Sequence, residues 1–209
     1  MGDSPSKYEQ PLQPQPQPLW AVEPRFCINR EVTLLMREKI FSFSGDDFKI
    51  KEPQTDQVWF RVHGKAFSFR EKKTLMDYAG VPVLNIKESL MAFMEPNYKV
   101  YRGDDSNQEL FKVIAHISFA KAKMHTYIVN GQTNQQLMIV LKGNILQKQA
   151  AVYIGEPKQG GIPIAKIYRP YTGREFFSSA QDYYITVAPN VDVSLIVALC
   201  VGMDEMKND

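Results

Sequence analysis

The sequence predicts a mainly β protein, a closed antiparallel barrel that encloses its own C-terminal helix. From Phe26 onward, short stretches alternate apolar with polar residues and are separated by turn-forming residues, which is typical of antiparallel strands. Near the C-terminus, Leu195 to Val201 contains no polar residue on any face, so a helix there must be enclosed. The 209 residues, 44% of them hydrophobic, are sufficient for one domain with a core.

Residues 1–24 differ in composition from the rest, and six of the 13 prolines fall there. Such a Pro/Gln-rich composition favours extended chain and offers little to bury. We therefore expect a disordered tail over residues 1–24 and a barrel domain over residues 25–209. Pro11 and Pro14 have the spacing of an SH3 ligand but lack a flanking arginine, which favours a plain spacer. The first residues fit a loose acylation pattern at Gly2, although Asp3 argues against it.

Strands are expected where apolar residues recur at every second position. The clearest stretches are 58–62, 67–69, 111–117, 137–142 and 183–187. Glycine, proline, aspartate and asparagine lie between them, for example at Gly103-Asp104-Asp105 and Asn130-Gly131. Strands that repeat roughly every 8–13 residues, with few helical stretches between them, predict a barrel or a sandwich.

The C-terminal apolar segment is expected to be a helix inside the barrel. Pro189 marks its boundary, and Asn190 or Asp192 can cap its first turn. At about 1.5 Å per residue, residues 193–203 span about 16 Å, roughly half of a bilayer core. Burial within the protein therefore explains this segment better than a membrane does. The residues expected in the buried central helix are Leu195, Ile196, Val197, Ala198, Leu199, Cys200 and Val201.

An ordered set of segments resembles the LURP-one-related family, which belongs to the tubby-like superfamily together with the phospholipid scramblases. The segments are 34–39, 41–48, 60–65, 75–77, 80–84, 98–103, 182–192, 195–199 and 203–205. The resemblance implies a 12-stranded antiparallel barrel around a hydrophobic C-terminal helix. Tubby proteins bind phosphoinositides at a basic barrel surface and scramblases are linked to lipid movement, but the resemblance transfers neither function to particular residues of this chain.

The charge balance and the known motifs exclude several functions. Lys and Arg total 25 against 23 Asp and Glu, a net charge of +2, which gives no general attraction to nucleic acid. No nucleophile elbow, P-loop, dinucleotide-binding or zinc-protease motif occurs. We therefore expect no catalytic residue, no cofactor and no metal, and a protein that is not an enzyme.

The remaining chemistry-bearing residues have structural interpretations. The histidines His63, His116 and His125 are expected to be surface or packing residues, and the aspartate pairs Asp46-Asp47 and Asp104-Asp105 are expected to support turns. Cys27 and Cys200 are expected to be free, buried thiols, which favours a cytoplasmic protein.

Two short basic stretches are the positive signal for a ligand. Arg70, Lys72 and Lys73 form the first, and Lys121 and Lys123 form the second. Such clusters bind anionic headgroups, although they also occur on ordinary charged surfaces. We hypothesise a monomeric, non-enzymatic binding or scaffold module, cytoplasmic or peripheral at a membrane, that binds a phosphoinositide-containing surface. The alternatives are a protein-interaction adaptor acting through residues 1–24 and, less favoured, lipid scrambling by insertion of the terminal helix.

Overall fold

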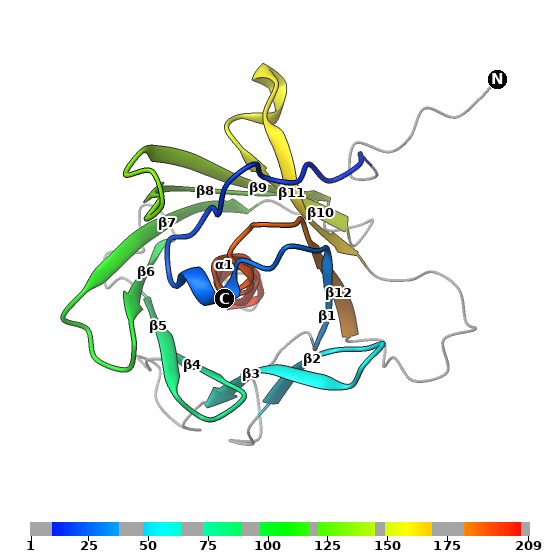
Figure 1. Ribbon diagram of the computed structural model, residues 1–209. Coiled ribbons are helices and arrows are strands. Elements are labelled where there is room, and N and C mark those ends of the chain that lie inside the picture. The colour runs from blue at the N-terminus through cyan, green and yellow to red at the C-terminus, as the bar shows by residue number, and fades with distance from the viewer. Residues whose placement is uncertain are drawn as a thin grey trace.

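Twelve strands in the described part of the chain close into an antiparallel barrel (Figure 1). The computed structural model describes residues 10–37, 48–63, 73–88, 97–117, 121–144, 149–168 and 182–205. The strands are β1 (Val32–Arg37), β2 (Phe48–Glu52), β3 (Gln57–His63), β4 (Lys73–Asp77), β5 (Pro82–Glu88), β6 (Asn97–Arg102), β7 (Glu109–Ile117), β8 (Lys121–Val129), β9 (Gln136–Asn144), β10 (Gln149–Ile154), β11 (Ile162–Tyr168) and β12 (Asp182–Val187). Each strand pairs with the next in sequence, and β1 pairs with β12 to close the ring. The predicted barrel is confirmed, and the predicted strand at 67–69 lies outside the described residues.

The alternation in the sequence separates the inside of the barrel from the outside. Along β8, Ala122, Met124, Thr126 and Ile128 are buried, whereas the residues between them are exposed or half-buried. Successive side chains of a strand point to opposite faces, so one set lines the interior. A barrel leaves no free sheet edge, and its interior must be filled.

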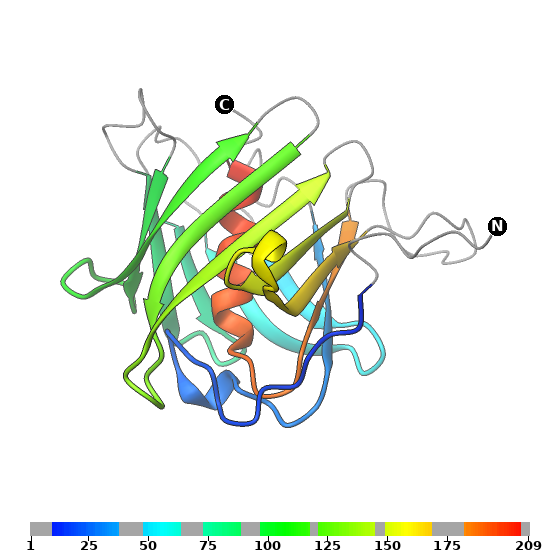
Figure 2. The same cartoon turned by 90° about the horizontal axis from the view of Figure 1, so that it is seen from above.

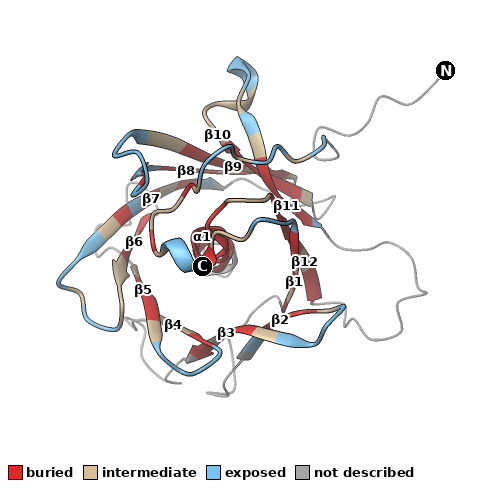
Figure 3. Ribbon diagram, viewed as in Figure 1, coloured by how far each residue is buried: buried red, intermediate tan, exposed pale blue. Residues whose placement is uncertain are grey.

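Helix α1 (Val193–Glu205) fills that interior and runs along the barrel axis (Figure 2). Every residue of 193–203 is buried, including all of Leu195–Val201 (Figure 3). Burying a side chain such as Leu or Ile stabilises a fold by about 1.5–3 kcal/mol relative to exposure. The predicted central helix is thus confirmed. In the part of the chain that the structure describes, no helix combines the length and apolarity required to cross a membrane.

A close approach between α1 and β6 fixes the identity of one helix residue. A Cβ added to Gly202 would lie 1.9 Å from Cζ of Tyr98 and 2.1 Å from its hydroxyl. The Tyr98 hydroxyl also donates a hydrogen bond of 3.4 Å to the carbonyl of Ala198. Glycine therefore makes room for an aromatic ring against the helix backbone, at a cost in helix propensity of about 1 kcal/mol.

Residues 10–24, here called the strap, cross the end of the barrel at which α1 begins (Figures 1 and 2). Three of its backbone N–H groups donate hydrogen bonds to carbonyl groups of the barrel end. Gln13 donates to Pro163, Gln15 to Pro189 and Leu19 to Asn190. The strap side chains of Leu19 and Val22 are buried. The Trp20 ring lies so close to the turn after β8 that a Cβ on Gly131 would come within 2.2 Å of it.

The expectation of a disordered tail is therefore wrong for residues 10–24. Extended, proline-rich chain makes no internal hydrogen bonds, so its free N–H and C=O groups can pair with a neighbouring surface. The turns at this end of the barrel supply that surface. Residues 1–9, including Gly2, lie outside the described residues.

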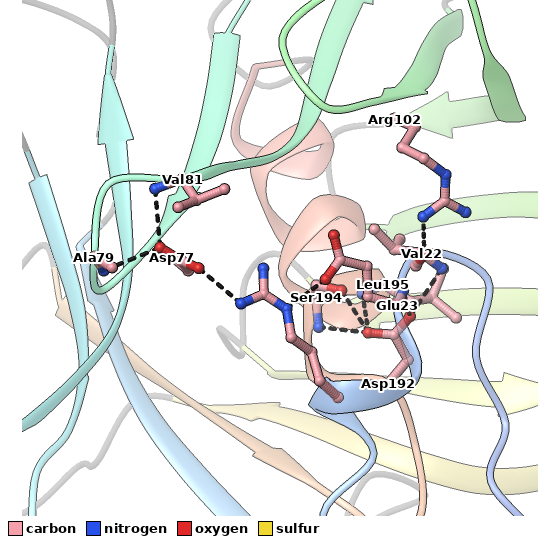
Figure 4. A network of polar contacts seen from close by, with 10 residues as sticks. Val22, Glu23, Asp77, Ala79, Val81, Arg102, Asp192, Ser194 and Leu195 are labelled. Carbon is pink, nitrogen blue, oxygen red and sulfur yellow. Dashed lines mark hydrogen bonds and ion pairs between the residues drawn. The ribbon is translucent and has the colours of Figure 1, made fainter.

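Asp192 joins the strap to the start of α1 (Figure 4). Its side chain is fully buried. Oδ2 accepts hydrogen bonds from the backbone N–H groups of Ala21, Val22 and Glu23, at 3.3, 2.9 and 3.3 Å. Oδ1 accepts from the N–H groups of Ser194 and Leu195, at 3.0 and 3.3 Å, and so caps the helix. One carboxylate thus holds two segments that are about 170 residues apart.

Two arginines connect the strap and the residue after it to the strands at the same end of the barrel. Arg25 follows the strap and donates to Asp77 at 2.7 Å, while Arg102 donates to the carbonyl of Val22 at 2.6 Å. Asp77 also accepts from the N–H groups of Ala79 and Val81, both at 2.9 Å. Burial raises the pKa of Asp77, but these hydrogen bonds and Arg25 outweigh it and hold the pKa below its ordinary value.

Neither cysteine forms a disulfide, as predicted. Cys200 is buried in α1, as expected, but the expected burial of Cys27 is wrong, because this residue is only half-buried beside the strap. Burial, together with the charge of Asp192, raises the pKa of the Cys27 thiol to about 12. A thiol with so high a pKa is almost entirely protonated at neutral pH and is a poor nucleophile.

Candidate functional site: a basic wall outside the barrel

Lysines from three strands form a row across the outside of the barrel. Lys123 on β8 lies opposite Lys142 on β9. Lys142 lies opposite Ala151 on β10, and Ala151 lies opposite Lys166 on β11. Directly paired residues of neighbouring strands project from the same face. This face is the outer one, because the residues on either side of Lys123 along β8 are buried in the interior.

Further basic side chains extend the row. Lys121 and His125 lie two residues from Lys123 on the same face of β8, and His116 on β7 lies opposite Lys123. The rings of His116 and His125 stack with their centroids 5.9 Å apart. We call this set the basic wall; it consists of Lys121, Lys123, Lys142 and Lys166 with His116 and His125.

Acidic residues are absent from the strands that carry these lysines. The sequences of β8, β9, β10 and β11 contain no Asp or Glu. Like charges directly opposite one another on neighbouring strands destabilise a sheet, so the pair Lys123–Lys142 requires a counter-charge.

Glu156 supplies that counter-charge from the turn between β10 and β11. Its Oε2 lies 2.8 Å from Nζ of Lys123, and its Oε1 lies 3.4 Å from Nζ of Lys142. The hydrogen bond from Lys123, aided by that from Lys142, holds the pKa of Glu156 below its ordinary value against the opposing effect of burial. Two cations thus share one carboxylate, which leaves the group of three with one net positive charge.

The turn that carries Glu156 is fixed by its own backbone. Gly155, in a left-handed conformation with φ of 79°, donates to the carbonyl of Met138 on β9 at 2.8 Å. Gln159 and Gly161 donate back to the carbonyl of Glu156 at 2.9 and 3.1 Å. A Cβ on Gly161 would lie 2.8 Å from the Gly155 carbonyl oxygen. Any residue other than glycine would therefore force the backbone of the turn to move. In Figure 1 this turn (yellow) projects outside the ring of strands.

Exposed apolar side chains accompany the basic wall. Tyr127 and Val129, on the same face of β8, are each 55% exposed. Tyr168 on β11 stacks on Tyr184 of β12 with centroids 5.6 Å apart. Aromatic side chains with one apolar and one polar end suit the boundary between water and lipid.

A small cavity lies inside the barrel beside α1. It has a volume of about 10 Å³ and is lined by Val62, Lys73, Thr74, Leu75, Leu84, Ile86, Ala198 and Val201. This volume holds about one water molecule, so it cannot hold an organic substrate. Among the described residues, no three His, Cys, Asp or Glu side chains come together as metal ligands.

The pattern of the family described as LURP-one-related matches residues 32–204, which is most of the chain. The chain belongs to the LURP-one-related family. Relatives in Arabidopsis thaliana include Protein LURP-one-related 15, 25% identical over 191 residues (90% of this chain and 86% of the relative). They also include Protein LURP-one-related 10, 24% identical over 192 residues (90% and 96%). The protein YxjI of Bacillus subtilis (strain 168) is 24% identical over 173 residues (83% and 92%).

A solved structure supports the same LURP-one-related fold. An X-ray structure of a protein from Arabidopsis thaliana has a TM-score of 0.63 to this chain at 21% identity. The similarity covers 91% of this chain and 99% of the other. At that identity, the likeness concerns the fold alone.

The described residues of the two basic stretches that the sequence analysis proposed as a lipid-binding site do not lie together in the structure. Lys121 and Lys123 lie on the basic wall, whereas Lys73 lines the cavity beside α1, four strands away. Arg70 and Lys72 lie outside the described residues. Within the described part of the chain, the two stretches do not form one patch.

Sequence reasoning missed Lys142, Lys166 and Glu156. Each lysine stands alone in its strand, so no local cluster marks it. The alternation over residues 137–142 could have placed Lys142 outside the barrel, but not opposite Lys123. The predicted turn at Gly103-Asp104-Asp105 is confirmed, because Asp105 accepts a hydrogen bond from the Asn107 N–H at 3.0 Å; Asp46 and Asp47 lie outside the described residues.

Proposed function

We propose that the chain is a non-enzymatic module that docks on phosphoinositide-containing membrane surfaces through its basic wall. The row Lys123–Lys142–Lys166, on strands that carry no acidic residue, is the observation that supports this function. The exposed Tyr127 and Val129 provide apolar contacts on the same side of the barrel. The protein then acts in the cytoplasm as a monomer, peripheral to the membrane.

The strength of the electrostatic attraction between the basic wall and an anionic membrane indicates which kind of headgroup is needed. A lysine close to an anionic membrane contributes about 1 kcal/mol. Four lysines, less the opposing charge of Glu156, therefore supply at most about 3 kcal/mol, which corresponds to a dissociation constant of about 6 mM. General attraction of this size is weak, so useful affinity requires specific contacts with a densely charged headgroup.

Vesicle flotation tests the proposal. The wild-type protein should float with phosphatidylcholine vesicles that contain phosphatidylinositol bisphosphate, and not with phosphatidylcholine alone. High salt should release it, because exposed charges are screened over about 10 Å at an ionic strength of 0.1 M. Replacing Lys142 and Lys166 together by Gln should reduce retention strongly.

The matched control replaces Lys49 and Lys51 together by Gln, which removes the same number of positive charges. Both lysines lie on β2, on the other side of β1 from the wall, and neither is buried. This change should leave retention nearly unchanged. Equal retention of the control and the double variant would contradict a role for the wall, and no retention of the wild type at low salt would contradict membrane docking itself.

The contacts of the strap and of α1 weigh against the two alternatives. An adaptor that presents residues 1–24 as a free chain would have to detach residues 10–24, whose backbone is bonded to the barrel. Scrambling by insertion of Leu195–Val201 would require the barrel to open, because these residues are buried inside it. Both functions therefore carry an unfolding cost that docking through the outer wall does not.

A further inference from the structure

The carboxylate of Glu156 marks a position at which an anion contacts two lysines at once. Its two oxygens lie 2.8 Å from Nζ of Lys123 and 3.4 Å from Nζ of Lys142. Strand register places Lys123 and Lys142 opposite one another on adjacent strands, so one anion can contact both ammonium groups. The protein's own Glu156 side chain occupies this site.

The charges in this site do not balance. Two lysines carry two positive charges and Glu156 returns one. A phosphomonoester carries about −1.5 to −2 charges at pH 7 and offers three acceptor oxygens, so it neutralises both lysines and saturates more of their N–H groups. A phosphodiester, such as the headgroup linkage of phosphatidylserine, carries one negative charge on the phosphate and gains nothing over the tethered carboxylate.

Exchange of Glu156 for a ligand requires little rearrangement. The side chains of Lys123, Lys142 and Glu156 are 40%, 32% and 17% exposed. The backbone of the turn is held by bonds that do not involve the Glu156 carboxylate, notably Gly155 to Met138. The side chain can therefore turn toward solvent while the turn stays in place.

We propose that Glu156 makes the basic wall selective, because it occupies the site between Lys123 and Lys142 against monoanionic groups and yields it to phosphomonoesters. The proposal rests on the proposed function and names the headgroup class that this site accepts. The Glu156 carboxylate competes with ligands for the two lysines, and this competition lowers the affinity for weakly charged ligands more than for strongly charged ones.

The test compares Glu156→Gln with Glu109→Gln. Glu109 forms an ion pair of 2.7 Å with Lys99, between β6 and β7, and the two replacements change the net charge equally. Each variant and the wild type are titrated with vesicles containing phosphatidylinositol bisphosphate and with phosphatidylserine vesicles of equal surface charge. A soluble probe, inositol trisphosphate, is titrated in parallel while the backbone amide signals of Gly155 and Glu156 are followed by NMR.

We expect the wild type to prefer phosphatidylinositol bisphosphate at equal vesicle charge. Glu156→Gln should tighten binding to phosphatidylserine by about fivefold, the factor that corresponds to loss of one competing surface ion pair, and change phosphoinositide binding less. Glu109→Gln should affect both lipids alike. Inositol trisphosphate should shift the Gly155 and Glu156 amides of the wild type.

Two results would overturn the selectivity proposal and one would overturn the docking function alone. If the wild type binds phosphoinositide vesicles but Glu156→Gln changes both lipids by the same factor as Glu109→Gln, docking stands and the role of Glu156 is wrong. If inositol trisphosphate leaves the amides of the Glu156 turn unchanged, the site is not a phosphomonoester site. If the soluble probe binds there but vesicles are not bound, the site stands and membrane docking fails.

Discussion

Asp192 and Glu156 each collect several hydrogen-bond donors, but in opposite surroundings. Asp192 is fully buried at the start of α1 and takes its donors mainly from backbone N–H groups of the strap and the helix. Glu156 lies on the outside of the barrel and takes its donors from two lysine side chains that reach solvent. Backbone donors fixed by the fold have no second partner, whereas lysines at a surface can exchange theirs. The first arrangement therefore stabilises the structure, and the second is suited to binding.

The pKa shifts of the two carboxyl groups support the same distinction. Burial raises the pKa of Asp192 above its ordinary value, although hydrogen bonds from Ser194, Val22, Glu23 and Leu195 act in the opposite direction. At Glu156 the two lysines lower the pKa. The charge of Asp192 is therefore costly to bury and depends on backbone donors that the fold supplies, whereas the charge of Glu156 is favoured by two lysine side chains that are partly exposed.

Substitution of Asp192 should destabilise the protein more than any other change considered below. Replacing Asp192 with Ala leaves buried N–H groups of both the strap and the first turn of α1 without partners, and each such group costs about 1–3 kcal/mol. We expect a loss of at least about 3 kcal/mol in the free energy of unfolding, measured by urea denaturation. Asp192→Asn keeps one acceptor oxygen and should lose less. A loss under about 1 kcal/mol in the alanine variant would show that the strap is not held through this residue.

The packing along α1 gives the next effect. Gly202→Ala should destabilise the protein by about 1–3 kcal/mol, the usual cost of overpacking, because the new Cβ overlaps the Tyr98 ring. Helix propensity alone predicts the opposite sign, a gain of about 1 kcal/mol. Thermal or urea unfolding distinguishes the two. In a Tyr98→Ala background the loss caused by Gly202→Ala should disappear, and its persistence would contradict the steric explanation.

The fold was predictable where its signals are local. The apolar run at Leu195–Val201 and the period-two strands indicated a barrel around a helix, and Asp192 was one of the two expected helix caps. The docking of the strap was not predictable, because its partners, such as Asp192 for Val22, lie about 170 residues away and exist only once the barrel has closed. Composition indicated extended chain, but it could not indicate whether a surface would accept that chain.

The basic wall was only half predictable for a related reason. Lys121 and Lys123 attracted attention because they are close in sequence. Lys142 and Lys166 join them through strand register, which a single sequence leaves open. Conversely, Lys73 was grouped with Arg70 and Lys72 by sequence proximity, yet its strand turns it toward the cavity beside α1.

Glu52 is intermediate between the two carboxylates. It is itself buried, but its partner Arg30, which donates to it at 2.7 and 2.9 Å, is half exposed. Arg30 lowers the pKa of Glu52 from 4.5, so this pair contributes stability above pH 4.5 that is lost as the pH falls through the lower pKa of the folded state. Glu52→Gln should cost about 1 kcal/mol at pH 7 and make the acid side of the stability profile shallower. An unchanged acid profile, measured by urea denaturation at several pH values, would contradict this assignment.

The exposed carboxylate of Glu156 should contribute least to the stability of the fold. Glu156→Gln removes the counter-charge of Lys123 and Lys142, yet all three side chains are partly exposed, and exposed pairs contribute about 0.2–1 kcal/mol. The loss of stability should therefore stay within about 1 kcal/mol, and it should shrink with added salt, because salt screens the remaining repulsion between the lysines. Urea denaturation at low and high salt measures both. A loss as large as that of Asp192→Ala would mean that the turn needs the Glu156 carboxylate in order to fold, and a side chain with that role could not be given up to a ligand.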